Sequence, residues 1–505
     1  MRWSKEFGVK AAGLFALGCV LCGSLARPAA AQTDIPPAAA QKQPEMSNMT
    51  LVGYNDLQAR SAYQPVIKKQ GDRWIAYIGH HGGTELNPLN GEMEANGTSV
   101  LDVTDPKNPK YLFHIPGEAV KGTVTPGGGG SESGGAQMVR ACAGSELPHA
   151  DKSKFYLLRN YGNTAQEMWD VTNPAKPTRI TVIASGLRDT HKNWWECNTG
   201  IAYLVSGVPD WRTLRLAMIY DLSNPAKPVF IRNFGLPGTQ PGSTGPLPGR
   251  MHGPISTGPK GNRVYFAFES GGSGIFEIVD RDKLLNGPKE PTEDNLRYPV
   301  IGRVDLPPDI GAHTAFPLLQ MEVPEFAKQK IGKVKDFLAI VAESGPNECQ
   351  EARQMLRIFD ISTESMPIGI STWTVPEASG NFCDKGGRYG THSTNESFSP
   401  IYYKRVLFVA HFSAGLRALD IRDPYHPKEI AYYIPAITKN TDKRCVGKGA
   451  DEKCKIAIQT NNVEVDDRGY IYITDRANTG LHILELTGAA RQVADFSQAG
   501  KPPVY

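Results

Sequence analysis

Histidine is the residue type whose placement in this sequence points most directly to chemistry. Four of the 11 histidines open a predicted strand at the same position of four successive sequence repeats. They are His191 in T-H-K-N-W-W-E, His252 in M-H-G-P-I-S, His313 in A-H-T-A-F-P and His392 in T-H-S-T-N-E. Neutral imidazole is the commonest protein ligand for zinc, copper and iron. Four imidazoles that meet in space would hold a transition metal with open coordination positions.

Further candidates accompany these four histidines. His80 and His81 follow one predicted strand and His411 ends another, so strand direction puts all three at the same end of the fold. We predict all seven histidines as metal ligands, with copper or iron expected and zinc as the alternative. Glu196 and Glu396 lie shortly after two of the histidines and are predicted to orient imidazoles or transfer protons. A structural alternative is that the repeated histidine bonds the backbone of a neighbouring repeat.

The elements that must position these residues come from a repeated strand and turn. Its clearest copies are V-L-D-V-T-D-P-K-N-P (100–109), M-W-D-V-T-N-P-A-K-P (168–177) and I-Y-D-L-S-N-P-A-K-P (219–228), with weaker copies at 275–280, 357–362, 418–427 and 482–487. Proline fixes the turn after the strand. An apolar strand precedes each copy. Four short strands repeated seven times predict an all-β, seven-bladed β-propeller with four-stranded blades.

In a propeller the first strand of each blade lines the central channel, so the four histidines are expected to converge at one mouth. Gly/Pro-rich and polar insertions between the repeats are expected to form long loops on that face, where binding usually occurs. Residues 49–57 form a strand that could complete the last blade, and residues 490–496 compete for that place. His114, His426 and His482 fall on outer strands or turns and are expected at the surface.

The repeated third strands resemble those of the bacterial LVIVD-repeat β-propellers. This resemblance covers nearly all of the chain after residue 48 and implies the propeller fold, but says little about activity. The expected histidine arrangement is similar, at the level of fold alone, to two families of propeller metalloenzymes. These are the carotenoid-cleavage oxygenases, with four histidines on iron, and the copper-linked methanethiol oxidases of the selenium-binding-protein type. The sequence motifs of neither family are matched.

The N-terminus has the features of a secretory signal. Arg2, Lys5 and Lys10 precede a short apolar run (11–22), and three alanines (29–31) form a cleavage site. We therefore predict a signal peptide (1–31), a disordered segment (32–48) and one propeller domain (49–505). The apolar run is too short for a stable membrane span, so the mature chain is expected to have no transmembrane anchor. The predicted location is the periplasm or the extracellular space.

The cysteines predict a disulfide, and the net charge bears on the class of partner. An exported chain can form disulfides, and Cys445 and Cys454 lie in one charged loop, so we predict that they pair. The formal net charge is only +3, and no run of lysine and arginine is interleaved with aromatic residues. Nucleic acid is therefore not an expected partner.

Together these features predict an exported metal-dependent enzyme that acts on a small molecule, with a redox reaction preferred over hydrolysis. The alternative is a non-catalytic scaffold in the periplasm or on the cell surface, which binds protein partners through its long loops.

Overall fold

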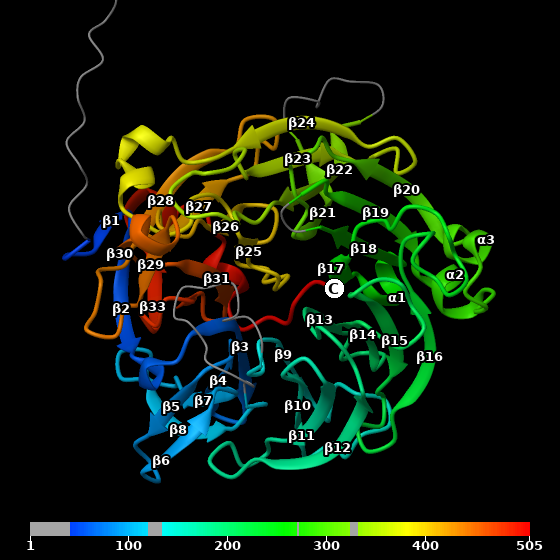
Figure 1. The fold of residues 1–505 in the computed structure, drawn as a ribbon, viewed down its shortest axis with the longest axis horizontal. Coiled ribbons are helices and arrows are strands. Elements are labelled where there is room, and N and C mark those ends of the chain that lie inside the picture. Colours follow the sequence, from blue (N-terminus) through cyan, green and yellow to red (C-terminus); the bar gives the residue numbers. More distant parts are fainter. Residues whose placement is uncertain (1–40, 120–133, 270–271, 324–331) are drawn as a thin grey trace, which may run out of the picture. The chain divides into compact units, whose positions relative to one another are not determined.

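The computed structural model describes residues 41–119, 134–269, 272–323 and 332–505. Seven antiparallel sheets stand around a central channel like the blades of a propeller (Figure 1). This confirms the predicted seven-bladed fold with four-stranded blades. The predicted signal peptide and most of the predicted disordered segment lie outside the described residues.

The first three blades follow one another along the chain. Blade one contains β3 (Ala62–Gln70), β4 (Arg73–His80), β7 (Thr98–Asp102) and β8 (Lys110–Ile115). Blade two contains β9 (Val139–Ala143), β10 (Phe155–Tyr161), β11 (Ala165–Asp170) and β12 (Thr178–Ser185). Blade three contains β13 (Asn193–Trp195), β14 (Ile201–Ser206), β15 (Leu216–Asp221) and β16 (Val229–Phe234).

The other four blades complete the ring. Blade four contains β17 (Met251–Ser256), β18 (Arg263–Phe268), β19 (Ile275–Asp280) and β20 (Val300–Asp305). Blade five contains β21 (Thr314–Glu322), β22 (Val334–Val341), β23 (Leu356–Asp360) and β24 (Ile368–Trp373). Blade six contains β25 (Ser393–Thr394), β26 (Val406–Ala410), β27 (Leu416–Asp420) and β28 (Lys428–Ile434). Blade seven contains β31 (Thr460–Val465), β32 (Ile471–Asp475), β33 (Leu481–Leu486) and the N-terminal β2 (Met49–Asn55).

The N-terminal segment closes the ring. β2 pairs antiparallel with β33, with Met49 opposite Leu486, and so supplies the outer strand of blade seven. Residues 490–496, the other candidate for this place, instead follow the helix α4 (Gly488–Arg491) and lead into the 3₁₀ turn η6 (Phe496–Gln498). β1 (Glu45–Ser47) pairs with the outer edge of β28. Disorder was predicted up to residue 48, but residues 45–47 form this strand.

The repeated sequence explains both the core and the turns. The second strand of each blade is largely apolar because each blade packs between two others; all of β26, for example, is buried. At the end of the third strand the aspartate carboxylate accepts the backbone N–H two residues later, as Asp102 does from Thr104 at 2.9 Å and Asp221 from Ser223 at 2.8 Å. These Asx turns fix the path into the fourth strand.

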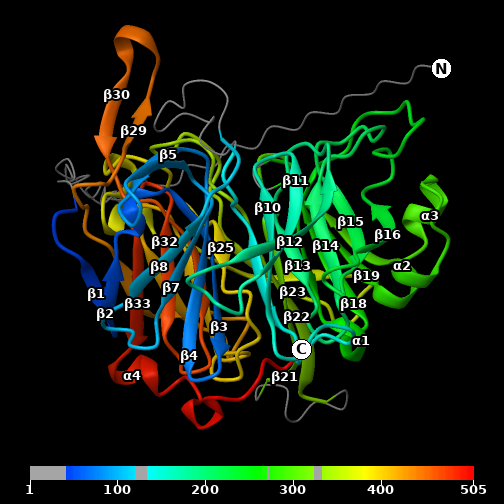
Figure 2. The same ribbon diagram turned by 90° about the horizontal axis from the view of Figure 1, so that it is seen from below.

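Two hairpins are added to the basic blade pattern. β5 (Thr84–Asn87) and β6 (Glu92–Ala95) are inserted within blade one, and β29 (Lys443–Val446) and β30 (Lys453–Ile456) lie between blades six and seven. We call the face from which β29 and β30 project the upper face, and the face that carries α4 the lower face (Figure 2).

Short helical segments complete the described structure. The α-helices besides α4 are α1 (Gly258–Gly261), α2 (Arg281–Asn286) and α3 (Glu293–Arg297), and the 3₁₀ turns besides η6 are η1 (Leu57–Ala59), η3 (Glu377–Ser379), η4 (Phe382–Asp384) and η5 (Gly449–Asp451). Within the described ranges no helix is long and apolar enough to cross a bilayer.

Three disulfides form. Cys445 and Cys454 are bonded across the β29–β30 hairpin, which confirms the prediction. The other two bonds, which the sequence left open, are Cys142–Cys197 and Cys349–Cys383.

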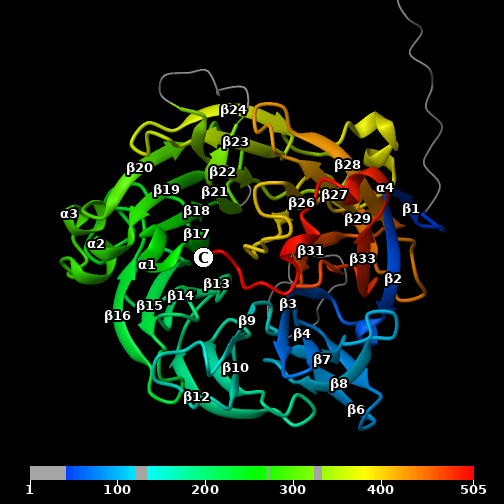
Figure 3. The same ribbon diagram turned by 180° about the vertical axis from the view of Figure 1, so that it is seen from behind.

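The C-terminal residues cross the lower end of the channel (Figures 1 and 3). Gly500 donates its N–H to the carbonyl of Asp467 in blade seven, and Val504 donates to Phe398 in blade six. The Tyr505 ring packs against Phe398 with 5.2 Å between ring centroids. Residues 500–505 therefore form a strap over this end of the channel.

Candidate metal centre in the central channel

The four repeated histidines meet inside the channel near its upper end. His191, His313 and His392 stand just before β13, β21 and β25, and His252 lies at the start of β17. The ring centroids are 4.6 Å apart for His191 and His252, 3.6 Å for His252 and His313, and 4.3 Å for His313 and His392. Equivalent positions on neighbouring first strands thus bring four imidazoles into contact.

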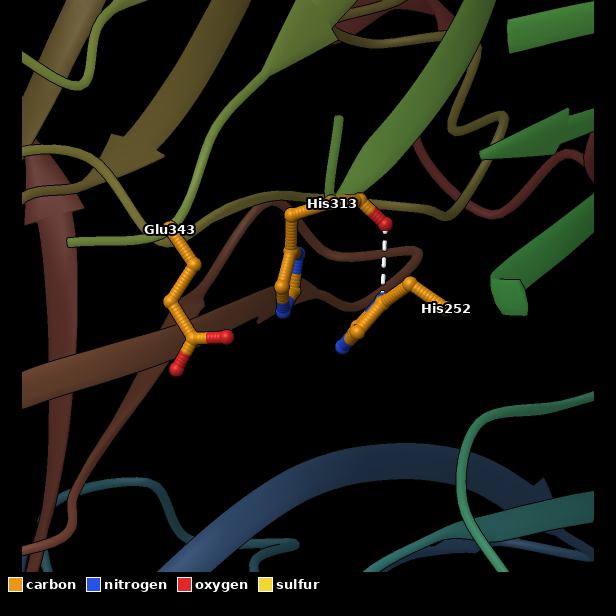
Figure 4. A group of neighbouring side chains, drawn as sticks. All are labelled: His252, His313 and Glu343. Atoms are coloured by element: carbon orange, nitrogen blue, oxygen red, sulfur yellow. Dashed lines mark hydrogen bonds between the residues drawn. The ribbon is translucent and has the colours of Figure 1, made fainter. Parts of the chain in front are cut away.

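Two of these rings are oriented by backbone carbonyls. His252 Nδ1 lies 2.8 Å from the His313 carbonyl, and His392 Nδ1 lies 2.5 Å from the Asn461 carbonyl (Figure 4 shows the first). A carbonyl only accepts, so each Nδ1 carries the proton and each Nε2 keeps its lone pair. A backbone carbonyl on one ring nitrogen, with the other nitrogen free to bind, is the usual arrangement of a metal-ligating histidine.

The nitrogen positions fit a single metal ion. His191 Nε2 and His252 Nε2 are 2.8 Å apart and share a hydrogen bond, in which His191 donates because His252 carries its proton on Nδ1. Two nitrogens each at about 2.1 Å from one ion can be at most ~4.2 Å apart, so a metal ion could take the place of this proton. His392 Nε2 is buried without a hydrogen-bond partner in the described part of the chain. Because a buried polar atom normally has a partner, this free nitrogen is itself a mark of a ligand site.

A glutamate and a tyrosine complete the cluster. Ligand atoms of His252, His313 and Glu343 all lie within 4.8 Å of one another (Figure 4). The Tyr63 hydroxyl is 3.5 Å from Nε2 of both His191 and His313. Tyr63 lies on β3, at the position of blade one that is equivalent to the histidines of blades three to six. This equivalence in the repeat is the sequence feature that could have identified Tyr63 as part of the cluster.

Burial keeps the imidazoles neutral. Desolvation lowers the pKa of His191, His252 and His313 well below the usual value, and neighbouring cationic side chains and imidazoles lower it further. Desolvation also lowers the pKa of His392, to about 4, although the nearby Glu343 carboxylate opposes this shift. At neutral pH the rings therefore carry the lone pairs that a metal requires.

The structure brings one of the three other predicted histidines to this cluster. His81 lies with its ring centroid 4.9 Å from that of Tyr63. His80 instead bonds Ser99, with 2.6 Å between Nε2 and Oγ. His80 reaches the cluster indirectly, because His80 Nδ1 and His81 Nδ1 both contact Ser61. His411 bonds Thr374.

The two predicted catalytic glutamates, Glu196 and Glu396, form ion pairs away from the imidazoles. Glu196 is bound by Arg281 at 2.7 Å, by Tyr203 and by Ser256. The structure does not bring it to the imidazoles. A strand rises about 3.3 Å per residue, so a glutamate four or five residues beyond a histidine lies roughly 13–17 Å further along.

Glu396 belongs to a second buried cluster, below the histidines. Its carboxylate contacts Lys192 and Arg140, and its backbone N–H donates to Glu464. Desolvation, followed by the charge of Glu396, raises the pKa of Glu464 to about 7. Lys192 donates to Thr314 Oγ1, which also contacts His313 Nδ1. Glu396 is thus linked to the histidines through two intervening side chains.

Beneath this second cluster lies a cavity of about 140 Å³ lined by Arg140, Trp194, Glu396 and Glu464. A larger neighbouring cavity of about 360 Å³ is lined partly by residues 500–503 of the strap. The strap therefore covers this end of the channel.

Two histidines expected at the surface are buried. His114 binds Glu94, with 2.5 Å between Nδ1 and Oε2. His482 packs between Tyr54 and Tyr433. Glu94 of the inserted β6 covers His114, and β2 pairs with β33 and covers His482. Without these added strands both histidines would lie at the outside of a blade. His426 is exposed, as expected.

Comparison with known proteins finds only distant structural similarity. No family model and no curated protein matches this chain. Solved structures with a similar fold include two of Sqt1 from Chaetomium thermophilum. One, free, has 10% identity over 87% of this chain and 98% of its own, with a TM-score of 0.48. The other, bound to the N-terminus of ribosomal protein L10, has 10% identity over 86% and 99%, with a TM-score of 0.47.

A structure of Raptor from the same organism also matches, with 10% identity and a TM-score of 0.46. The match covers 90% of this chain but only 29% of Raptor. Structural similarity this weak gives no evidence about ligands or partners.

Proposed function

We propose that this chain binds a transition-metal ion through His191, His252, His313 and His392 and uses it in a redox reaction on a small molecule. One observation carries the proposal: four buried imidazoles are in contact, and backbone carbonyls hold Nδ1 of His252 and His392. All-nitrogen ligation suits copper or iron better than a thiolate-selective metal. A bound ion would supply electron transfer and Lewis acidity.

The surrounding side chains have defined parts in this proposal. The Tyr63 hydroxyl lies against two of the imidazoles and can hold or give a proton at that point. Glu343 offers a carboxylate that can bind the ion or accept a proton. The apolar walls of the blades exclude water and strengthen the electrostatic interactions within the site.

Export and family membership are part of the same proposal. Three disulfides are expected in an oxidising compartment, which supports a periplasmic or extracellular location. The repeated strands that end in Asp-Pro or Asn-Pro turns support membership of the LVIVD-repeat propellers.

The test is elemental analysis of the purified mature chain after loading with copper, iron or zinc. The wild type should retain stoichiometric metal after dialysis, and the double variant His252→Ala/His313→Ala should retain none. The double variant His80→Ala/His411→Ala is the matched control, because it also removes two buried histidines but should keep the metal. Absence of metal from the wild type under all three loadings would refute the proposal.

A second candidate function, a non-catalytic interaction scaffold, is favoured by the inserted β5–β6 hairpin. Leu86, Leu89 and Met93 are 50%, 55% and 64% exposed on this one hairpin, and clustered exposed apolar side chains are typical of interaction sites. The triple variant Leu86→Ser/Leu89→Ser/Met93→Ser should then lose a specific partner that the wild type captures from a periplasmic extract. Identical captured proteins for both chains would count against this function.

A further inference from the structure

On the upper side of the histidines, two arginines bind one carboxylate. Glu343 Oε1 lies 2.9 Å from Arg388 Nη1 and 3.3 Å from Arg476 Nη1. The same oxygen is 3.6 Å from His392 Nε2. A carboxylate thus already sits between two guanidinium groups at the edge of the imidazole cluster. The position of Glu343 shows that the spacing of the two guanidinium groups suits a carboxylate.

The two guanidinium groups are held in place by other contacts. Both lie over the ring of Phe412, at 5.6 Å for Arg388 and 5.9 Å for Arg476. Arg388 also donates to the Ser344 carbonyl, and Arg476 Nη2 lies 3.1 Å from His81 Nε2. Guanidinium groups held in this way lose little conformational freedom when they bind an anion.

This side of the cluster is nearer to solvent than the other. The side chains of Arg388 and Glu343 are 22% and 14% exposed, whereas those of Lys192 and Glu396, below the histidines, are each 2% exposed. The Arg476 side chain is 5% exposed, so a ligand that approaches the imidazoles from the upper face meets Arg388 first.

The charge on this side also favours an anion. Asp189 contacts Arg215 and Arg250, and Glu343 contacts Arg388 and Arg476, so each carboxylate faces two guanidinium groups. Glu351 is a further carboxylate near Arg388. A metal ion bound by neutral imidazoles would add further positive charge. Electrostatic focusing then raises the local concentration of anions and lowers that of cations.

We propose that the substrate of the centre is a small molecule with a carboxylate group, and that Arg388 and Arg476 bind this group next to the imidazoles. The inference rests on the proposed metal centre, because the arginines are placed to hold a substrate against that ion. A guanidinium presents its N–H donors in a planar fork that matches the geometry of a carboxylate.

The test is a titration of the copper(II)-loaded full chain with benzoate, followed by the visible and electron paramagnetic resonance spectra of the copper. Benzamide, which has the same shape without the charge, is the control ligand. Benzoate should perturb the spectra and benzamide should not, and added salt should weaken the effect because the interaction is ionic.

Variants separate the arginines from the metal. Arg388→Gln and Arg476→Gln should each keep the copper and weaken benzoate binding by about tenfold or more, as expected for loss of a charge-assisted hydrogen bond. Arg388→Lys should recover part of the affinity, because the charge returns without the fork. Arg353→Gln, on an exposed side chain, should change nothing.

The possible failures are distinguishable. A wild type that retains no metal would refute the proposed function, and this inference with it. A metal-loaded wild type that binds benzamide as well as benzoate would overturn only the inference. So would benzoate affinities within about twofold of the wild type in both glutamine variants that still hold copper.

Discussion

The channel contains two buried polar clusters that differ in how their charges and lone pairs are satisfied. In the lower cluster, Lys192 and Arg140 pair with Glu396, and Glu464 accepts hydrogen bonds from the backbone of Glu396 and Ser397. Almost every group has an opposite partner, which is what a structural ion network requires.

The upper cluster is built from imidazoles and has no buried lysine–glutamate pair like that of Lys192 and Glu396 among its described residues. Its imidazoles are neutral, two are oriented by backbone carbonyls, and His392 Nε2 has no hydrogen-bond partner among the described residues. The contrast teaches that burial and charge alone do not identify a site. The convergence of four neutral imidazoles in the upper cluster does.

The largest expected effect comes from breaking the lower cluster. Glu396→Ala leaves Lys192 buried without its carboxylate, so we expect the free energy of unfolding to fall by about 3–5 kcal/mol, measured by urea denaturation. Glu293→Ala removes the exposed partner of Arg297 and should cost about 0–1 kcal/mol. Equal losses in the two variants would show that the lower cluster is no tighter than a surface pair.

Metal should stabilise the upper cluster only when its histidines are intact. With free metal at about 100 times the dissociation constant, the wild type should gain about 2.7 kcal/mol of unfolding free energy. The metal-free and metal-loaded forms of His252→Ala/His313→Ala should be equally stable in the same denaturation assay. A similar gain in that variant would place the metal elsewhere.

Stability should respond to pH through Glu464 in the lower cluster. Its folded pKa of about 7 exceeds the ordinary value of 4.5, so between these pH values the folded chain holds a proton that the unfolded chain releases. This contribution is complete below pH 4.5 and is lost as the pH rises through 7. The charged groups that face Glu464 are the carboxylate of Glu396 and the cations Arg140 and Lys192.

Glu464→Gln cannot release this proton. Relative to the wild type, it should therefore gain about 2–3 kcal/mol of stability between pH 5 and pH 8, at 1.4 kcal/mol per pKa unit, measured by denaturation at each pH. A constant difference across this range would mean that Glu464 titrates normally in the fold.

The smallest effect is expected from removing the strap. A chain that ends at Ala499 loses the hydrogen bond of Val504 and the packing of Tyr505, but the upper face is left unchanged. We expect the rate of copper uptake, followed by stopped-flow absorbance, to stay within about twofold of the wild type, a small difference in activation free energy. A large increase in the rate of copper uptake would show that the metal enters through the lower end of the channel.

The sequence predicted the fold because the repeated strand, its Asx turn and the apolar strand before it specify one blade each. It also predicted the meeting of four histidines, because equivalent positions on first strands face one channel. The positions of Arg388, Arg476 and Glu343 were not predictable in this way, since they follow from loops and strand ends of different blades. Nearness in sequence misplaced Glu196, because five residues of strand span about 17 Å.

The most direct test of the central claim is the X-ray absorption spectrum of the copper-loaded chain. The account predicts several imidazole nitrogens at about 2.0 Å from the metal, with the imidazole scattering lost in His252→Ala/His313→Ala. A coordination shell of oxygen or sulfur without imidazole, or an unchanged spectrum in the double variant, would contradict it.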